Sequence, residues 1–201
     1  MGVMMGDMDK GQKTFSQDFN LDEKDFNNAQ ALKMLRNRNK QAIKQYGDYT
    51  LWEFPQSYAL IRNDVSEIGY IVKFKYKYFN RLQRKCVSQV MVWRDIGVAE
   101  QMGMAREIFF NYLLPTTQTI ISDSMQTPEG KAFWWRRIHE AFSNGMYVYY
   151  INLTQPSTFI KVSNAQELRA IDSASWGDHQ RYQSSRVIIT TKSFDKDLLT
   201  G

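Results

Sequence analysis

Ten basic side chains, gathered in two stretches of this 201-residue sequence, are the residues best suited to bind an anion. Neither stretch, over residues 31–47 and 68–94, contains an acidic residue. The first supplies Lys33, Arg36, Arg38, Lys40 and Lys44, and the second supplies Lys73, Lys75, Lys77, Arg81 and Arg84. Phosphates are bound by clustered cations, which predicts nucleic acid or another acidic surface as a partner. Solvated faces of a helix or an antiparallel sheet carry such lysines as well, so both interpretations stay open.

Three hydroxyl groups could take part in proton transfer. Tyr149 and Tyr150 lie in the strand-like run MYVYYINL, and Ser124 lies at the C-terminal end of another predicted strand. A tyrosine or serine so placed can protonate a leaving group. Aromatic strand residues are more often part of a core, and a serine after a strand also caps turns, so a structural role competes with the catalytic one.

The sequence predicts no metal site. Its one cysteine, Cys86, lies inside a strand pattern and cannot form an intramolecular disulfide. The two histidines, His139 and His179, are not spaced with it as zinc ligands are.

The elements that must position these groups centre on residues 93–142. A strand ending in MVWRD is followed by apolar residues at steps of three and four, which predicts a helix that Pro115 ends. TQTIISDS is the next strand. A second helix is marked by Thr127 as its N-cap, Pro128 in its first turn and Gly145 as its stop. This β-α-β-α unit predicts a compact α/β or α+β domain, in which helices pack against a sheet.

The flanking segments complete the predicted architecture. Residues 1–19 are polar and aperiodic, which predicts a flexible tail. Residues 20–47 are predicted to form a basic helical arm, capped by Asn20 and stopped by Gly47. From residue 49 to 94 the apolar period changes to two, which indicates an antiparallel meander. Strands at 146–153, 158–162 and 186–192, with a helix from Ser163, complete a domain over 48–193, and 194–201 is predicted to be a loose tail.

Composition limits the classes of protein further. With 43% apolar residues and 14% aromatic ones, the chain can bury a sizeable core. There is no apolar run of about 18 residues and no secretory signal pattern, so we expect no membrane insertion and a cytosolic location.

Two stretches resemble the GNAT-type N-acyltransferase fold, most closely the divergent GNAT-like proteins of tailed bacteriophages. They are IISDSMQTPEGKAFWWRRI, a strand followed by a helix start, and WGDHQRYQSSRVIIT near the end of the chain. The order of elements in such proteins is a meander, a helix, a strand, a helix and closing strands, and it covers residues 49–193 here. The resemblance therefore implies an α+β fold with helices packed on a mixed, mostly antiparallel sheet.

This resemblance implies a candidate acetyl-CoA site. Enzymes of the family hold the pyrophosphate over the turn after their fourth strand, where backbone N–H groups at a helix start face the anion. The corresponding residues here are Gln101, Gly103, Met104, Ala105 and Arg106. Glu100 stands where the family has a cation or an amide.

Three functions follow as expectations. The first is a non-catalytic binding protein or virion or assembly component of a phage, located in the host cytoplasm or in the virion. It would associate with a host or phage protein or with itself, and would need no cofactor. The alternative is an acetyl-CoA-dependent N-acetyltransferase. The further alternative is a nucleic-acid-binding module, for which charge is the argument.

Overall fold

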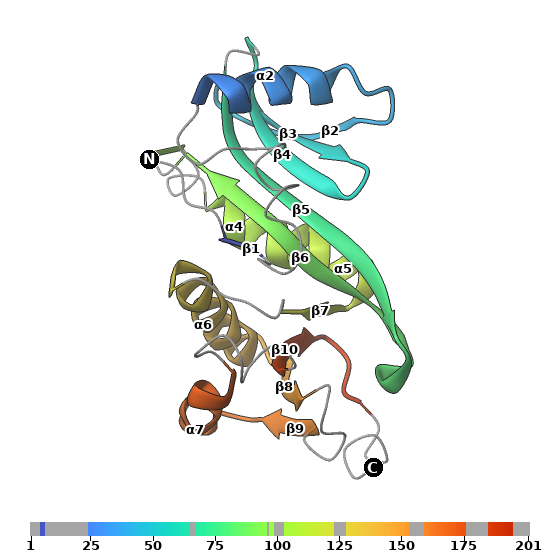
Figure 1. The fold of residues 1–201 in the computed structure, drawn as a ribbon, viewed down its shortest axis with the longest axis vertical. Coiled ribbons are helices and arrows are strands. Elements are labelled where there is room, and N and C mark those ends of the chain that lie inside the picture. Colours follow the sequence, from blue (N-terminus) through green and yellow to red (C-terminus); the bar gives the residue numbers. More distant parts are fainter. Residues whose placement is uncertain are drawn as a thin grey trace. The chain divides into compact units, whose positions relative to one another are not determined.

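The computed structural model of the chain describes residues 5–6, 24–64, 67–95, 97–98, 103–122, 128–152, 159–175 and 185–194. The protein is α+β, with a large, mostly antiparallel open sheet and helices packed on it (Figure 1). The strands are β1 (Met5–Gly6), β2 (Gln41–Tyr46), β3 (Tyr49–Phe54), β4 (Ser57–Arg62), β5 (Ile68–Phe79), β6 (Arg84–Arg94), β7 (Thr119–Ile121), β8 (Tyr147–Asn152), β9 (Phe159–Val162) and β10 (Ser185–Thr190).

The helical segments include one 3-10 turn and one π-helical stretch. They are α2 (Lys24–Leu35), the 3-10 turn η1 (Asn80–Leu82), α4 (Met104–Glu107), the π-helical stretch η2 (Ile108–Leu113), α5 (Leu114–Thr117), α6 (Pro128–Ser143) and α7 (Ala165–Ser175). Among the described residues, no helix is long and apolar enough to cross a membrane.

The chain divides into two compact units, and β5 and β6 contribute one end to each. The first unit comprises residues 1–74 and 90–108, and the second comprises residues 75–89 and 109–201. This division differs from the predicted single domain over 48–193, whose lower boundary falls inside the β2–β3 hairpin.

In the first unit, antiparallel neighbours follow one another in the order β2-β3-β4-β5. The hairpin turns contain residues with positive φ, Gly47 at 54° and Gln56 at 61°, and Pro55 precedes Gln56 with its φ preset. Gly47 therefore reverses the chain between two strands rather than ending a helix. Met5–Gly6, from the predicted tail, pairs antiparallel with the end of β6, and the other residues of the predicted tail up to 19 lie outside the described part.

Helix α2 is shorter than the predicted arm and is packed on the first unit. Ala31 is 2% exposed and belongs to a core cluster with Ile71 and Trp93. The Asn28 side chain also accepts a hydrogen bond of 3.0 Å from the Ile68 backbone N–H. Figure 1 shows α2 lying along β3 and β4.

The prediction of one helix over 20–47 was wrong in its second half, because α2 ends at Leu35 and residues 41–46 form β2. The Asn37 side chain accepts a hydrogen bond of 2.9 Å from the backbone N–H of Asn39, a local turn that competes with helix. The spacing of Ala42, Ile43 and Tyr46 suits a helix, yet β2 gains a strand partner in β3.

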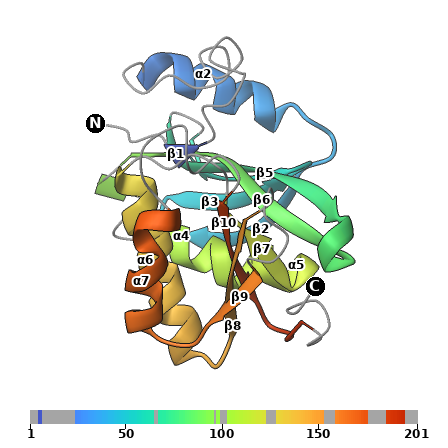
Figure 2. The ribbon, with the colours of Figure 1, turned by 60° about the horizontal axis from the view of Figure 1, so that its bottom comes forward.

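The second unit has the strand order β6-β7-β10-β8-β9. Strands β6 and β7 are parallel, with Val87 opposite Ile120, and the remaining neighbours are antiparallel. Figure 2 shows α6 and α7 next to one another beside β8 and β9. On α6, Trp134 is 2% exposed and packs edge to face with Phe109 at 5.6 Å between ring centroids.

The helix predicted to end at Pro115 continues to Thr117. A proline inside an α-helix loses a hydrogen bond and meets the carbonyl four residues earlier. Here the π-helical stretch η2 runs directly into α5, and Leu113 between them keeps helical dihedral angles. Pro115 therefore follows an irregular part of the helix, where the regular α-helical bond that it would break is already replaced. The Thr116 hydroxyl donates to the Tyr112 carbonyl at 2.7 Å, an additional bond within this helix.

The ends of the two last helices follow local rules. Helix α6 begins at Pro128 as predicted and ends in a Schellman motif, with Gly145 at φ 67° and the Met146 N–H donating to the Ala141 carbonyl at 2.9 Å. Thr127, its predicted N-cap, lies outside the described residues. The predicted Ser163 cap of α7 is one residue early, because Asn164 Oδ1 accepts the N–H of Glu167 at 3.0 Å.

The predicted loose tail begins one residue too early. Phe194 is 4% exposed, and its ring packs edge to face on Tyr149 with centroids 4.9 Å apart. Its backbone N–H donates to the Tyr149 hydroxyl at 3.2 Å. Residue 194 therefore belongs to the core, and residues 195–201 lie outside the described part.

Candidate anion-binding site

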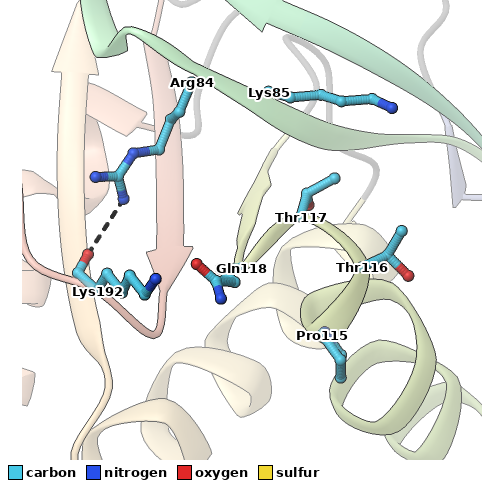
Figure 3. Close-up of a pocket in the computed structure, with 7 residues that line it drawn as sticks. All are labelled: Arg84, Lys85, Pro115, Thr116, Thr117, Gln118 and Lys192. Carbon is cyan, nitrogen blue, oxygen red and sulfur yellow. Dashed lines mark hydrogen bonds between the residues drawn. The ribbon is translucent and has the colours of Figure 1, made fainter.

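A pocket of about 410 Å³ lies in the second unit, between the start of β6, the end of α5 and the segment after β10 (Figure 3). Its lining residues are Arg84, Lys85, Pro115, Thr116, Thr117, Gln118 and Lys192. Three of them are cations and none is acidic. The volume is in the range of small-molecule sites in proteins.

The floor of the pocket is set by the way α5 ends. Gln118 adopts φ 60° and its N–H donates to the Leu114 carbonyl at 2.6 Å, which turns the chain out of the helix. The Gln118 carbonyl then accepts from the Thr191 N–H at 3.0 Å and the Thr190 hydroxyl at 2.8 Å. These bonds hold the end of α5 against the end of β10.

Arg84 is held in place by uncharged groups. Its guanidinium carbon lies 4.2 Å from the centroid of the Phe194 ring, a cation–π contact. Nη1 makes long contacts of 3.4 Å with the Lys192 carbonyl and 3.5 Å with the Thr190 hydroxyl. In the described part of the chain, neither Nη2 nor Nε of Arg84 donates a hydrogen bond. The guanidinium is thus oriented but retains donors.

Lys85 and Lys192 complete the basic lining. The Lys85 ammonium lies 4.1 Å from the centroid of the Tyr76 ring. Among the residues that the structure describes, no carboxylate pairs with Lys85, Lys192 or Arg84. Figure 3 shows the Arg84 side chain directed toward the Lys192 carbonyl, and the Lys192 side chain extending toward Gln118. Lys85 extends away from Arg84, over Thr117 and Thr116. The pocket therefore concentrates positive charge.

Cys86, next to these cations in sequence, is a buried free cysteine. Burial raises the pKa of its thiol to about 12, although the charge of Arg84 acts in the opposite direction. The thiolate, which is the reactive form, is therefore scarce at neutral pH. Among the described residues, no group of three Asp, Glu, His or Cys side chains could hold a metal ion.

The two tyrosines predicted as catalytic are core residues of the second unit. Tyr149 is 1% exposed and stacks on Phe159 with centroids 5.2 Å apart, and burial raises the pKa of its phenol. The Tyr150 hydroxyl is buried and lies 2.9 Å from the Ser185 hydroxyl. Neither phenol lines the pocket. Ser124, the third catalytic candidate, lies outside the described residues.

The predicted cofactor turn is described from Gly103 onward, and Gln101 lies outside the described part. Gly103 has φ 61° and precedes α4, with open space where a side chain would begin. Met104 is buried, whereas Ala105 is half-buried and Arg106 is exposed. Within the described residues, the backbone N–H groups of Met104 and Ala105 donate to no acceptor. The backbone of this half of the turn is therefore open, whereas the Met104 side chain is buried; binding of a pyrophosphate here stays a prediction.

The ten predicted anion-binding residues divide between the two units. The first unit holds Lys33, Arg36, Arg38, Lys40, Lys44 and Lys73, and the second holds Lys75, Lys77, Arg81 and Arg84. Lys75 and Lys77 are exposed on β5, Lys73 is half-buried there, and Arg81 lies in η1. Of the ten, Arg84 lines the pocket.

Sequence reasoning missed Lys85 and Lys192 as site residues. Lys85 directly follows Arg84 in the same basic stretch, and this proximity was the signal that could have identified it. Lys192 lies 108 residues after Arg84, and only the pairing of strands brings the two together.

No known family model matches this chain, and no curated protein matches it. Its class therefore follows from the structure itself: an α+β protein with a mostly antiparallel open sheet and a basic pocket in its second unit.

Proposed function

We propose that this chain is a non-catalytic binding protein with a GNAT-like fold, of the kind found in tailed bacteriophages. It associates with an acidic surface of a partner protein, as an assembly component in the host cytoplasm or virion. The observation that carries the proposal is a group of exposed cations in the first unit that form no ion pair with any described residue. The order of elements supports the GNAT-like part, because a meander is followed by a helix, a strand, a helix and closing strands.

The unpaired cations are Lys33, Arg36 and Arg38, at the end of α2 and in the turn after it, which we call the basic corner. All three are exposed, and none forms an ion pair within the described residues. The other two cations of this stretch have partners. Lys44 pairs with Glu107 at 3.0 Å, and Lys40 donates to the Asn37 carbonyl at 3.3 Å.

The basic corner is also held at a fixed place. Helix α2 is anchored by Ala31 in the core, and the turn after it is closed by the Asn37 side chain. Charges on an ordered backbone lose less conformational entropy on binding than charges on a free tail. Because α2 is anchored in this way, deleting residues 1–46 is not a suitable test of association with a partner. The deletion would uncover the core of the first unit and remove β2.

A charge-reversal variant of the basic corner tests the proposal. The substitutions Lys33→Glu, Arg36→Glu and Arg38→Glu should abolish binding to polyglutamate and to a short DNA duplex, because cations facing an anionic probe are replaced by repelling acids. For DNA, the slope of log affinity against log salt should fall by about one for each phosphate that the variant no longer neutralises. Fluorescence anisotropy at several salt concentrations measures both effects.

The matched control carries the same change in net charge on the second unit. Arg136→Glu, Lys161→Glu and Arg169→Glu also replace three exposed cations. This control variant should retain most of the affinity for polyglutamate and for the DNA duplex. Equal losses in the two variants would show that net charge alone governs binding, and the basic corner would then have no special role. Stronger binding of DNA than of polyglutamate would instead favour the nucleic-acid-binding alternative.

The acetyltransferase alternative is favoured by one observation, the open backbone at Gly103 with two N–H groups that lack an acceptor within the described residues. If it holds, acetyl-CoA should bind saturably in a calorimetric titration. Gly103→Asn should weaken binding about tenfold or more, because a side chain would then block close approach to the backbone while asparagine still tolerates positive φ.

The control for this titration is Gly47→Asn, at a hairpin turn of the same unit with φ 54° and the same open surroundings. Gly47→Asn also places asparagine at a positive φ but leaves the predicted cofactor turn unchanged. The affinity of this variant for acetyl-CoA should therefore match that of the unchanged protein. No heat of binding with acetyl-CoA would remove the acetyltransferase alternative and leave the binding-protein proposal intact.

A further inference from the structure

We infer that the pocket formed by Arg84, Lys85, Lys192 and Gln118 binds the phosphate group of a small phosphorylated molecule. The site lies in the second unit and goes beyond the proposed function, because it uses none of the cations of the basic corner. Three properties of the pocket support this role: its charge, the orientation of Arg84, and its size and polarity.

The charge of the pocket is unbalanced. The lining contains three cations and no acid, and in the described part of the chain none of the three has a carboxylate partner. Cations on an ordinary protein surface are usually interspersed with acids, and like charges gathered around one cavity repel each other. A dianionic phosphate would relieve this repulsion better than a singly charged carboxylate.

The end of helix α5 does not account for these cations. Lysines and arginines often gather at a helix C-terminus, where they bond to the last carbonyls. Here the Leu114 carbonyl accepts from the Gln118 N–H, and the Gln118 carbonyl accepts from Thr190 and Thr191. Within the described residues, none of the three cationic groups donates to a carbonyl of α5.

Arg84 is oriented for a ligand before one binds. Its guanidinium rests on the Phe194 ring, and Nη1 is directed at the Lys192 carbonyl, so Nη2 and Nε keep their hydrogens for a ligand. A planar fork that is oriented in advance loses little entropy when it binds two phosphate oxygens. Figure 3 places the Lys192 ammonium on the same side of the pocket, next to the side-chain oxygen of Gln118.

The size and polarity of the pocket suit a phosphorylated sugar. About 410 Å³ is enough for a phosphate with a sugar-sized group attached. The Thr116 and Thr117 hydroxyls donate to the Tyr112 and Thr119 carbonyls, which leaves their oxygen lone pairs as acceptors at the far side. Hydroxyl groups of a sugar could donate to them. The lining therefore fits a sugar phosphate better than an apolar ligand.

Calorimetric titration of the full chain with ribose 5-phosphate, ribose and gluconate tests this inference. Ribose 5-phosphate should bind saturably, ribose should not bind, and gluconate, with one carboxylate, should bind more weakly. Affinity for ribose 5-phosphate should rise between pH 5 and pH 7, because the phosphate loses its second proton near pH 6, about where phosphomonoesters titrate. The affinity for gluconate should not change between pH 5 and pH 7, because its carboxylate is already ionised throughout this interval.

Substitutions then locate the site. Arg84→Gln should weaken ribose 5-phosphate binding about tenfold or more, since the neutral amide cannot form a charge-assisted bidentate pair with the phosphate. Lys192→Gln should weaken ribose 5-phosphate binding several-fold. Because Lys192 is exposed, this substitution should not affect folding. Lys161→Gln, an exposed cation of β9 that lies near Tyr147 and away from the pocket lining, is the matched control and should leave affinity unchanged.

Three results would overturn the inference. These are no saturable binding of ribose 5-phosphate, equal affinity for ribose 5-phosphate and gluconate, and equal weakening by Lys192→Gln and Lys161→Gln. Loss of polyglutamate binding in the basic-corner variant with unchanged ribose 5-phosphate binding would show that the two sites are separate, so either proposal can fail alone.

Discussion

Trp134→Ala should lower the free energy of unfolding by about 3–5 kcal/mol, the usual cost of removing a large aromatic side chain from a core. The Trp134 ring is 2% exposed and packs edge to face with Phe109 at 5.6 Å and with Phe133 at 6.2 Å between centroids. Its removal leaves a cavity and also takes away the two aromatic contacts. Urea unfolding followed by circular dichroism measures the decrease.

The next residue provides the matched control. Trp135 has the same chemistry but faces another side of α6, where it is half-exposed and tilted against His139 at 5.6 Å. Trp135→Ala should cost about 1 kcal/mol or less, within the range of surface substitutions and small contacts. Equal decreases in stability at the two positions would mean that the aromatic cluster around Trp134 does not stabilise the second unit.

Phe194→Ala should also be strongly destabilising, by about 3–4 kcal/mol. Phe194 packs edge to face with both Tyr149 and Phe159, at 4.9 Å and 5.3 Å between centroids. Its ring also supports the Arg84 guanidinium. We therefore expect a lower urea midpoint, together with weaker ribose 5-phosphate binding under conditions in which the variant is still folded.

Tyr78→Ala is a suitable comparison, since Tyr78 is an aromatic residue of the same unit that is 64% exposed. It should change the urea midpoint little. A chain ending at Ser193 should unfold as readily as Phe194→Ala, because both lack the same ring. If the shortened chain kept full stability, residue 194 would belong to a loose tail after all, as the sequence pattern suggests.

The parts of the fold that could be predicted from sequence are those fixed by neighbouring residues. Pro128 and Gly145 marked the ends of α6 correctly, because a preset φ and a positive φ are local properties. The alternation along β5 was readable in part, since Phe74 is buried while Lys75 and Lys77 are exposed. It was wrong at the two ends of the strand, because Ile71 is buried with Tyr70 and Tyr78 is exposed.

The sequence-based predictions were wrong where contacts between residues far apart in the sequence determine the structure. Residues 41–46 carry apolar residues at a spacing that suits a helix, and pairing with β3 makes them a strand. Phe194 looked like part of a polar end, yet Tyr149, forty-five residues earlier, accepts its N–H. Local patterns do not contain these contacts.

The pocket illustrates the same limit for a site. Its basic residues come from both ends of the second unit's sequence, and the approach of Arg84 to Lys192 depends on the order β6-β7-β10. The sequence identified Arg84 as an anion-binding candidate through the charge of its stretch. It did not reveal which other cations share its cavity, because that depends on strand order rather than on spacing.

The π-helical stretch before Pro115 also limits the insertions and deletions that the helix between Gly103 and Gln118 can tolerate. A π-helical stretch holds an extra residue relative to an α-helix, so removing one residue from Ile108–Leu113 would let this segment close into regular α-helix. The same deletion would place Pro115 inside regular α-helix, at a cost of about 3 kcal/mol. Among relatives that retain this pocket, we would therefore expect the number of residues between Gly103 and Gln118 to be constant, while insertions and deletions accumulate elsewhere.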